Sequence, residues 1–118
     1  TRMSIQVYWH KRNFDTQKTE RFFKERRIAY QSLDLGRHRL GRREAELLLR
    51  GAGIRAALDL GDLKVRSHPV AYTQDLETIV GYVLENPRFL VSPIIRSGNT
   101  VIAGFDEEKL RALAGADG

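Results

Sequence analysis

The chain reads NPRFLVSPII over residues 86–95, and this stretch decides how the C-terminal part folds. Asn86-Pro87 predicts the end of a helix, because the residue before a proline avoids helical backbone angles. Phe89 to Val91 then lead into a short strand that includes Ile94 and Ile95. Pro93 stands at the head of this strand, and that position singles out the architecture argued below.

The flanking segments predict a helix, a hairpin and a last helix. Apolar residues recur at 3–4 spacing over 73–84, which is typical of an amphipathic helix. After the strand, 97–99 predicts a turn and 100–103 a return strand, which together make a hairpin. Asp106 is placed to cap a helix over 107–113, and residues 115–118 are expected to form a frayed tail.

The N-terminal part predicts a strand, a helix and a second strand. Ile5, Val7 and Trp9 alternate with polar positions, which indicates a strand with these three side chains facing inward. A polar turn follows, and Asn13 or Asp15 can cap a helix that runs to about residue 26. Residues 28–35 read as a strand parallel to the first. We expect a helix over 41–49 that ends at the following glycines, one further turn over 54–60, and a loop over 61–71.

Length and composition predict one compact domain over residues 1–114, with a helical insert at about 41–84. The 118 residues are 42% hydrophobic and carry a formal charge of +5, so a core can form and an anionic partner is favoured. The sequence has no Cys, which excludes disulfides, thiol catalysis and thiolate metal centres. No apolar run approaches the roughly 18 residues of a membrane span, and no signal peptide is evident. We therefore expect a cytoplasmic protein with no metal, no cofactor and no membrane partner.

The chain resembles the arsenate-reductase family, which includes the Spx-type regulators, and this resemblance covers nearly its whole length. The most specific piece is the NPRFLVSPII segment, followed by the hairpin and by GFDEE at 104–108. The resemblance implies an α/β, thioredoxin-like fold of order β-α-β, helical insert, α-β-β-α. It also implies that Pro93 is cis and packs beside the first helix.

The family's chemistry depends on residues that this chain has replaced. The resemblance places the family's nucleophilic Cys at Asn13 and the second thiol of Spx-type members at Thr16. The arginines that hold the oxyanion correspond to Ser92, to Asp59 or Leu60, and to Gly104. Because an amide cannot act as a thiol nucleophile, we expect no redox catalysis, although an enzyme is not excluded.

A retained binding site is one interpretation of the first helix N-terminus, and simple helix capping is the other. Backbone N–H groups at a helix start attract anions. Asp15 would repel an anion there, whereas the cations at 11 and 12 would attract one. The candidate binding residues are Lys11, Arg12, Asn13, Phe14, Asp15, Thr16, Ser92 and Pro93. His10 has no evident nucleophile or carboxylate beside it, so a packing role is favoured over general-base catalysis.

An arginine-rich stretch over 37–43 is a candidate docking site for a protein, with a solvated loop as the alternative. It lacks nucleic-acid motifs and interleaved aromatics, so direct nucleic-acid binding is not expected. Its cations are Arg37, Arg39, Arg42 and Arg43. The resemblance to Spx-type proteins implies a protein partner, specifically the RNA polymerase α subunit, and a role in transcription. The alternative is a glutathione-dependent oxyanion reductase, or a protein that binds glutathione or a small anion.

Overall fold

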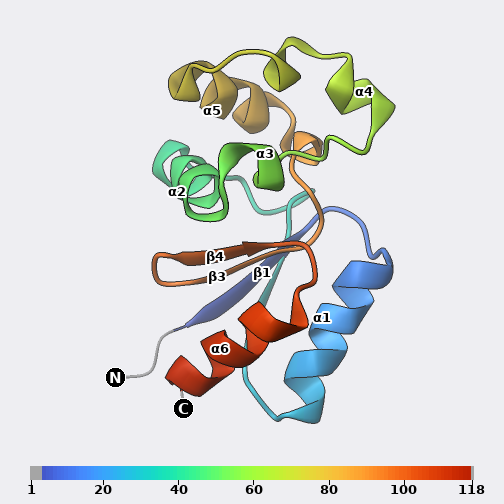
Figure 1. Cartoon of the computed structure of the whole chain (residues 1–118), viewed down its shortest axis with the longest axis vertical. Coiled ribbons are helices and arrows are strands. Elements are labelled where there is room, and N and C mark those ends of the chain that lie inside the picture. The colour runs from blue at the N-terminus through green and yellow to red at the C-terminus, as the bar shows by residue number, and fades with distance from the viewer. Residues whose placement is uncertain (1–3, 118) are drawn as a thin grey trace.

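A computed structural model describes residues 4–117 of the chain, and a four-stranded sheet forms its centre (Figure 1). The strands are β1 (Ile5–Trp9), β2 (Gln31–Asp34), β3 (Ile94–Ser97) and β4 (Thr100–Ala103), in the order β2-β1-β3-β4. β1 pairs with β2 in parallel, while the β1–β3 and β3–β4 pairs are antiparallel. The predicted β-α-β unit and C-terminal hairpin therefore share one sheet, and the predicted α/β, thioredoxin-like fold is confirmed.

Helices cover both faces of the sheet. On one face lie α1 (Phe14–Glu25) and α6 (Glu107–Asp117), which pack against Val7 and Ile95. The helical insert covers the other face, where Tyr8 and Ile94 enter a second core. Its helices are α2 (Arg42–Ala52), α3 (Ile54–Ala57), α4 (Leu63–Arg66) and α5 (Leu76–Glu85), with two 3-10 turns, η1 (Pro69–Ala71) and η2 (Pro87–Phe89).

Burial on both faces corrects the prediction for the first strand. Val7 and Tyr8 are both fully buried, although they point to opposite sides of β1. Trp9 was predicted to face the core with Ile5 and Val7, and it packs against that core on the α1–α6 side, where it is partly buried. Tyr8 occupies one of the positions predicted to be polar, and its burial shows that the helical insert covers this part of the second face.

Three segments differ in length from the predictions. α2 continues through Gly51 to Ala52 and ends at Gly53, whose φ of +94° suits a glycine. The predicted loop over 61–71 contains α4 and η1, because the side chains of Asp62 and His68 cap these short turns. α6 runs on through residues 115–117, which were predicted to form a frayed tail, and residue 118 lies outside the described part, so the fraying stays a prediction.

Gly51 lets α2 approach the sheet, and we expect Gly51→Ala to destabilise the fold. A Cβ at this position would lie 2.4 Å from Val101 Cγ2 and 2.8 Å from Val101 Cβ, on a stiff branched side chain. Overpacking of this kind costs about 1–3 kcal/mol and outweighs the helix-propensity gain of about 1 kcal/mol. A net loss of up to about 2 kcal/mol is therefore expected in urea unfolding.

Gly81 in α5 provides the matched control for this substitution. A Cβ there meets nothing within 4 Å, so Gly81→Ala should stabilise the protein by about 0.5–1 kcal/mol. Equal effects at the two glycines would contradict the close approach of α2 to β4.

Candidate functional site

The first helix begins at Asn13, which is its cap. Asn13 Oδ1 accepts a hydrogen bond from the Thr16 backbone N–H at 2.8 Å, as an N-cap side chain does. Its Nδ2 donates to the Ser92 carbonyl at 2.8 Å, across to the segment before β3. Of the two capping residues that the sequence left open, Asn13 fills the role, and Asp15 lies in the first turn.

Hydroxyl groups fill the space behind Asn13. Thr16 is fully buried, and its Oγ1 lies 2.8 Å from Asn13 Oδ1 and 3.0 Å from the Lys11 carbonyl. Ser92 Oγ lies 3.3 Å from Thr16 Oγ1 and donates to the same Lys11 carbonyl at 2.9 Å. The Ser92–Pro93 peptide bond is cis. The two positions matched to the family's thiols are thus joined in a closed hydrogen-bond network.

Three positions that the resemblance matched to family arginines meet at one pocket, and of the two alternatives in the insert it is Asp59, not Leu60, that lies there. Asp59, Ser92 and Gly104 come from three separate segments, and all of them line a small open pocket of about 180 Å³. None of them carries a guanidinium. Lys11 Nζ reaches Asp59 Oδ2 at 3.8 Å, while Asp15 adds a second carboxylate to the wall. Two carboxylates face one ammonium here, so the pocket disfavours an oxyanion.

The structure separates the other predicted binding residues from this pocket. Arg12 donates to both carboxylate oxygens of Glu20, at 3.0 and 3.1 Å, and its guanidinium lies 4.9 Å from the centre of the Trp9 ring. Phe14 is 72% exposed. Pro93 is buried. The pocket therefore includes Lys11, Asn13, Asp15 and Ser92 from the prediction, with Thr16 behind it.

The backbone beside the cis peptide bond is already paired within the chain. Val91 N–H donates to the Ala57 carbonyl at 2.8 Å, and Asp59 N–H donates to the Phe89 carbonyl at 2.8 Å. The Ser92 carbonyl accepts from Asn13, as described above. An extended peptide that added to this edge would have to displace these bonds.

His10 has the packing role that the sequence favoured. Its Nε2 lies 2.7 Å from the Leu90 carbonyl, so the neutral ring donates a hydrogen bond there. Burial lowers the pKa of His10 more than the Leu90 carbonyl raises it. The imidazole ties the end of β1 to the segment before β3.

Sequence reasoning missed a polar cluster beneath α2. The Tyr8 hydroxyl donates to Glu44 Oε2, and His38 Nε2 lies 3.0 Å from the same oxygen. Glu44 Oε1 also accepts from the Gly41 N–H at 3.2 Å, in a capping-box arrangement. The sequence signal that could have indicated this cluster is Glu44, which stands three residues after Gly41, the spacing of a capping box. This cluster fastens the helical insert to the sheet.

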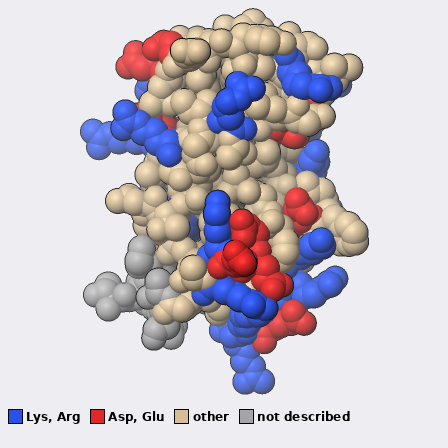
Figure 2. Space-filling model, viewed as in Figure 1, with Lys and Arg blue, Asp and Glu red and all other residues tan. Residues whose placement is uncertain are grey.

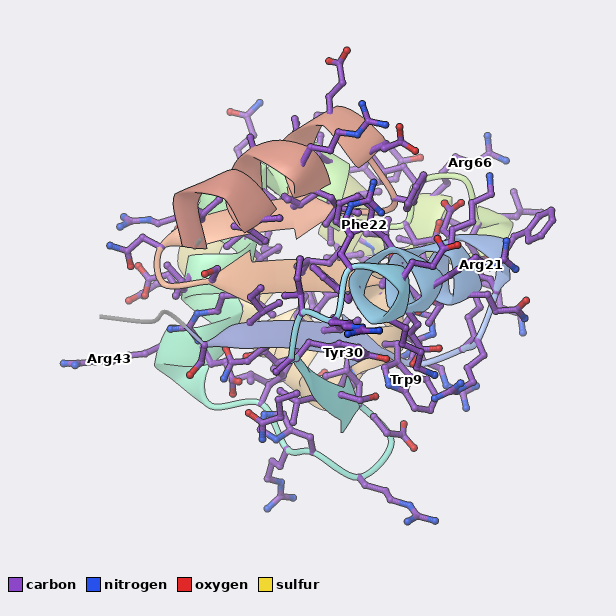
Figure 3. The ribbon with its side chains drawn as sticks, turned by 90° about the horizontal axis from the view of Figure 1, so that it is seen from below. Trp9, Arg21, Phe22, Tyr30, Arg43 and Arg66 are labelled. Atoms are coloured by element: carbon purple, nitrogen blue, oxygen red, sulfur yellow. The ribbon has the colours of Figure 1, made fainter. Side chains whose placement is uncertain are left out.

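The arginine-rich stretch runs from the loop after β2 into the first turn of α2, which holds Arg42 and Arg43. All four of its arginines are exposed, and Figure 3 shows Arg43 extending away from α2 into solvent. His38, within the same stretch, is turned inward to Glu44.

Two further searches cover residues 4–117 alone. None of their helices is both long and apolar enough to cross a membrane. Within the same residues, no group of three or more His, Asp or Glu side chains is arranged to hold a metal ion.

Solved structures with the same architecture cover almost the whole chain. A protein called YffB superposes with a TM-score of 0.80 at 17% identity, over 92% of this chain and 97% of its own. A putative ArsC family related protein from Bacteroides fragilis superposes with a TM-score of 0.79 at 14% sequence identity. This match covers 96% of this chain and 99% of that protein. The fold is that of the ArsC-like proteins. An arsenate reductase from Vibrio cholerae also superposes with a TM-score of 0.79, at 16% sequence identity. This match covers 95% of this chain and 98% of that protein.

The likeness to ArsC-like proteins lies in the fold. No protein-family model and no curated protein matches this sequence. The resemblance stated from the NPRFLVSPII segment and the hairpin is confirmed at the level of structure, and the chain differs from the family's thiol chemistry because it has no Cys.

Proposed function

We propose that this protein is a catalytically degenerate ArsC-like protein that acts by binding another protein. One observation carries the proposal: Ser92, Gly104 and Asp59, which is one of the two alternatives matched to the insert arginine, converge on a single pocket that is not lined by any arginine. With Asn13 and Thr16 at the thiol positions, that pocket has neither a nucleophile nor cations to hold an oxyanion. A cytoplasmic location fits this proposal.

The specific partner proposed is the RNA polymerase α subunit, with Spx-like regulation of transcription as the role. This proposal comes from the resemblance to Spx-type proteins, and the exposed Arg37 and Arg39 support it as a surface for an acidic partner. Arg12 does not belong to this surface, because Glu20 and the Trp9 ring hold it.

The test measures direct binding of the purified α subunit of the source organism by calorimetry. Arg37→Glu/Arg39→Glu should weaken binding by about tenfold or more, because each reversal replaces an attraction by a repulsion. Arg55→Glu/Arg66→Glu, at two other exposed arginines, is the matched control and should change affinity by less than about twofold.

A second arm measures arsenate, phosphate and glutathione with the same protein. No binding of arsenate, phosphate or glutathione is expected, because Asp15 and Asp59 repel anions and the Ser92 carbonyl already accepts a hydrogen bond from Asn13. Saturable binding of arsenate together with glutathione, with turnover, would replace the binding role by the reductase alternative.

A further inference from the structure

A surface groove between α1 and α6 lies apart from the candidate site. It encloses about 400 Å³, with Phe22 and Phe105 as its apolar residues and Lys18, Arg21 and Arg26 among its walls. Figure 3 shows Phe22 on the side of α1 that faces α6. We call this surface the α1–α6 groove.

Two of the three cations of the α1–α6 groove, Lys18 and Arg26, lie over aromatic rings. Lys18 Nζ lies 5.1 Å from the centre of the Phe14 ring and 5.6 Å from that of Phe105. The Arg26 guanidinium lies 3.8 Å from the centre of the Phe22 ring. These contacts fall within the range of cation–π attraction. Within residues 4–117, the ion pairs within 4.0 Å do not include Lys18, Arg21 or Arg26.

The groove belongs to a strongly basic part of the chain. Residues 11–27 hold seven Lys and Arg and three Asp and Glu, so this segment has a net charge of +4 out of +5 for the whole chain. Figure 2 shows Lys and Arg side chains gathered around the end of the molecule formed by α1 and α6, with Asp and Glu between them. Of the two carboxylates in the groove wall, Glu107 is bound by Arg111 at 2.7 Å. Charge complementarity therefore favours carboxylates as the incoming groups.

The aromatic residues decide between an acidic protein and a nucleic acid. Nucleic-acid binding through aromatic residues needs ring faces on which bases stack. Lys18 lies over Phe105 in the groove and over Phe14 outside its lining, and Arg26 covers Phe22. Phe14 is nevertheless 72% exposed, and its free edge can be covered by an apolar side chain.

We infer that the α1–α6 groove binds an acidic segment of a partner protein. Carboxylates of that segment meet Lys18, Arg21 and Arg26, and one of its apolar side chains packs on Phe14 and Phe105. The inference rests on the proposed function only in treating the chain as a protein-binding module. It uses a different surface from the arginines at 37 and 39.

The test titrates the full chain, labelled with nitrogen-15, with a synthetic peptide of alternating acidic and apolar residues (Asp-Phe-Glu-Leu repeats). Amide shifts are expected to concentrate at Lys18, Arg21, Arg26 and Phe105. A peptide with Lys in place of Asp and Glu should give no saturable shifts. Absence of saturable shifts in this groove at millimolar acidic peptide would overturn the inference.

Variants separate the groove from the general charge of the protein. Lys18→Glu/Arg21→Glu should weaken the acidic peptide by about tenfold or more, whereas Lys64→Glu/Lys109→Glu makes the same charge change at exposed positions outside the groove. Phe14→Ser should weaken it by about threefold or more, because that ring is exposed and its loss leaves the core intact. Equal weakening by both charge-reversal pairs would overturn the inference.

Two more outcomes place the result relative to other partners. Single-stranded DNA that shifts the same amides as tightly, with the same dependence on Phe14, would assign the groove to nucleic acid and overturn the inference. If the acidic peptide binds the groove while the RNA polymerase α subunit does not bind the chain, the polymerase proposal fails and this inference stands. Because the two surfaces are separate, Arg37→Glu/Arg39→Glu should weaken binding of the α subunit and leave the affinity for the acidic peptide unchanged.

Discussion

Glu44→Ala is expected to lower the free energy of unfolding by about 1.5–4 kcal/mol, which is a large share of the stability of a domain of this size. The fully buried Tyr8 loses the acceptor of its hydroxyl, at a cost of about 1–3 kcal/mol. The N-terminal cap of α2 at Gly41 is lost as well, for about 0.5–1 kcal/mol more. Urea unfolding followed by circular dichroism measures the change.

Glu46 in the same helix is the matched control for this prediction. It pairs only with the exposed Arg50, at 3.5 Å, so Glu46→Ala should cost less than about 0.5 kcal/mol. If the two substitutions cost the same, the cluster of Tyr8, Glu44 and His38 does not fasten the insert to the sheet.

The same cluster makes stability depend on pH in a definite direction. Burial, and then the hydrogen bond to Glu44, raise the pKa of Tyr8 from 10.0 to about 12. A raised pKa in the folded state means that the contribution is complete below pH 10 and is lost as the pH rises from 10 to about 12. Tyr8→Phe should therefore flatten the alkaline fall in unfolding free energy. Burial also raises the pKa of Tyr30. Part of the alkaline fall in unfolding free energy should therefore remain in Tyr8→Phe.

At acid pH the sign reverses for Glu44. Burial acts to raise its pKa, but the hydrogen bonds from Tyr8 and His38 outweigh burial and lower the pKa below 4.5. The contribution of a carboxyl with a lowered pKa is present above its unfolded value and is lost as the pH falls through the folded value.

Most of the fold could be predicted because its signals are local. Alternation in β1, the 3–4 spacing of α5 and the Pro93 strand each specify one element, and their order specifies the sheet. Burial of Tyr8 could not be predicted in this way, because a Tyr beside Gln6 reads as a polar position until a buried acceptor is known. Gly51 reads as a helix end, although its lack of a Cβ serves the approach of α2 to Val101.

The sequence predicted which residues form the candidate site, but it could not predict which of them contact one another. Asn13, Thr16 and Ser92 were named from the sequence, but their mutual hydrogen bonds depend on side-chain geometry. Likewise, the resemblance named Ser92, Gly104 and either Asp59 or Leu60 separately, and only the fold shows that Asp59 joins the other two at one pocket. Arg12 shows the reverse case, since Glu20, which lies eight residues along the chain, removes it from the site.

Asn13→Cys should restore an activated thiol without restoring oxyanion chemistry. A cysteine at a helix N-terminus has a pKa of about 3.5–7.5 instead of about 8.5, because the helix dipole and backbone N–H groups stabilise the thiolate. At pH 6 the introduced thiol should therefore react with a disulfide reagent about tenfold faster than that of Thr100→Cys, at an exposed strand residue. A thiol pKa equal to that of the control would mean that this helix start does not act as the family's does.

The double variant Asn13→Cys/Thr16→Cys separates the two losses that the site has undergone. Cysteines at 13 and 16 would stand in the Cys-x-x-Cys spacing at the start of α1, and they are expected to form a disulfide on mild oxidation, detectable by mass spectrometry. Arsenate reduction should stay absent, because Asp59 and Asp15 still face the pocket. Turnover of arsenate by this variant would show that the thiols alone were missing, and the weight placed on the lost arginines would then be wrong.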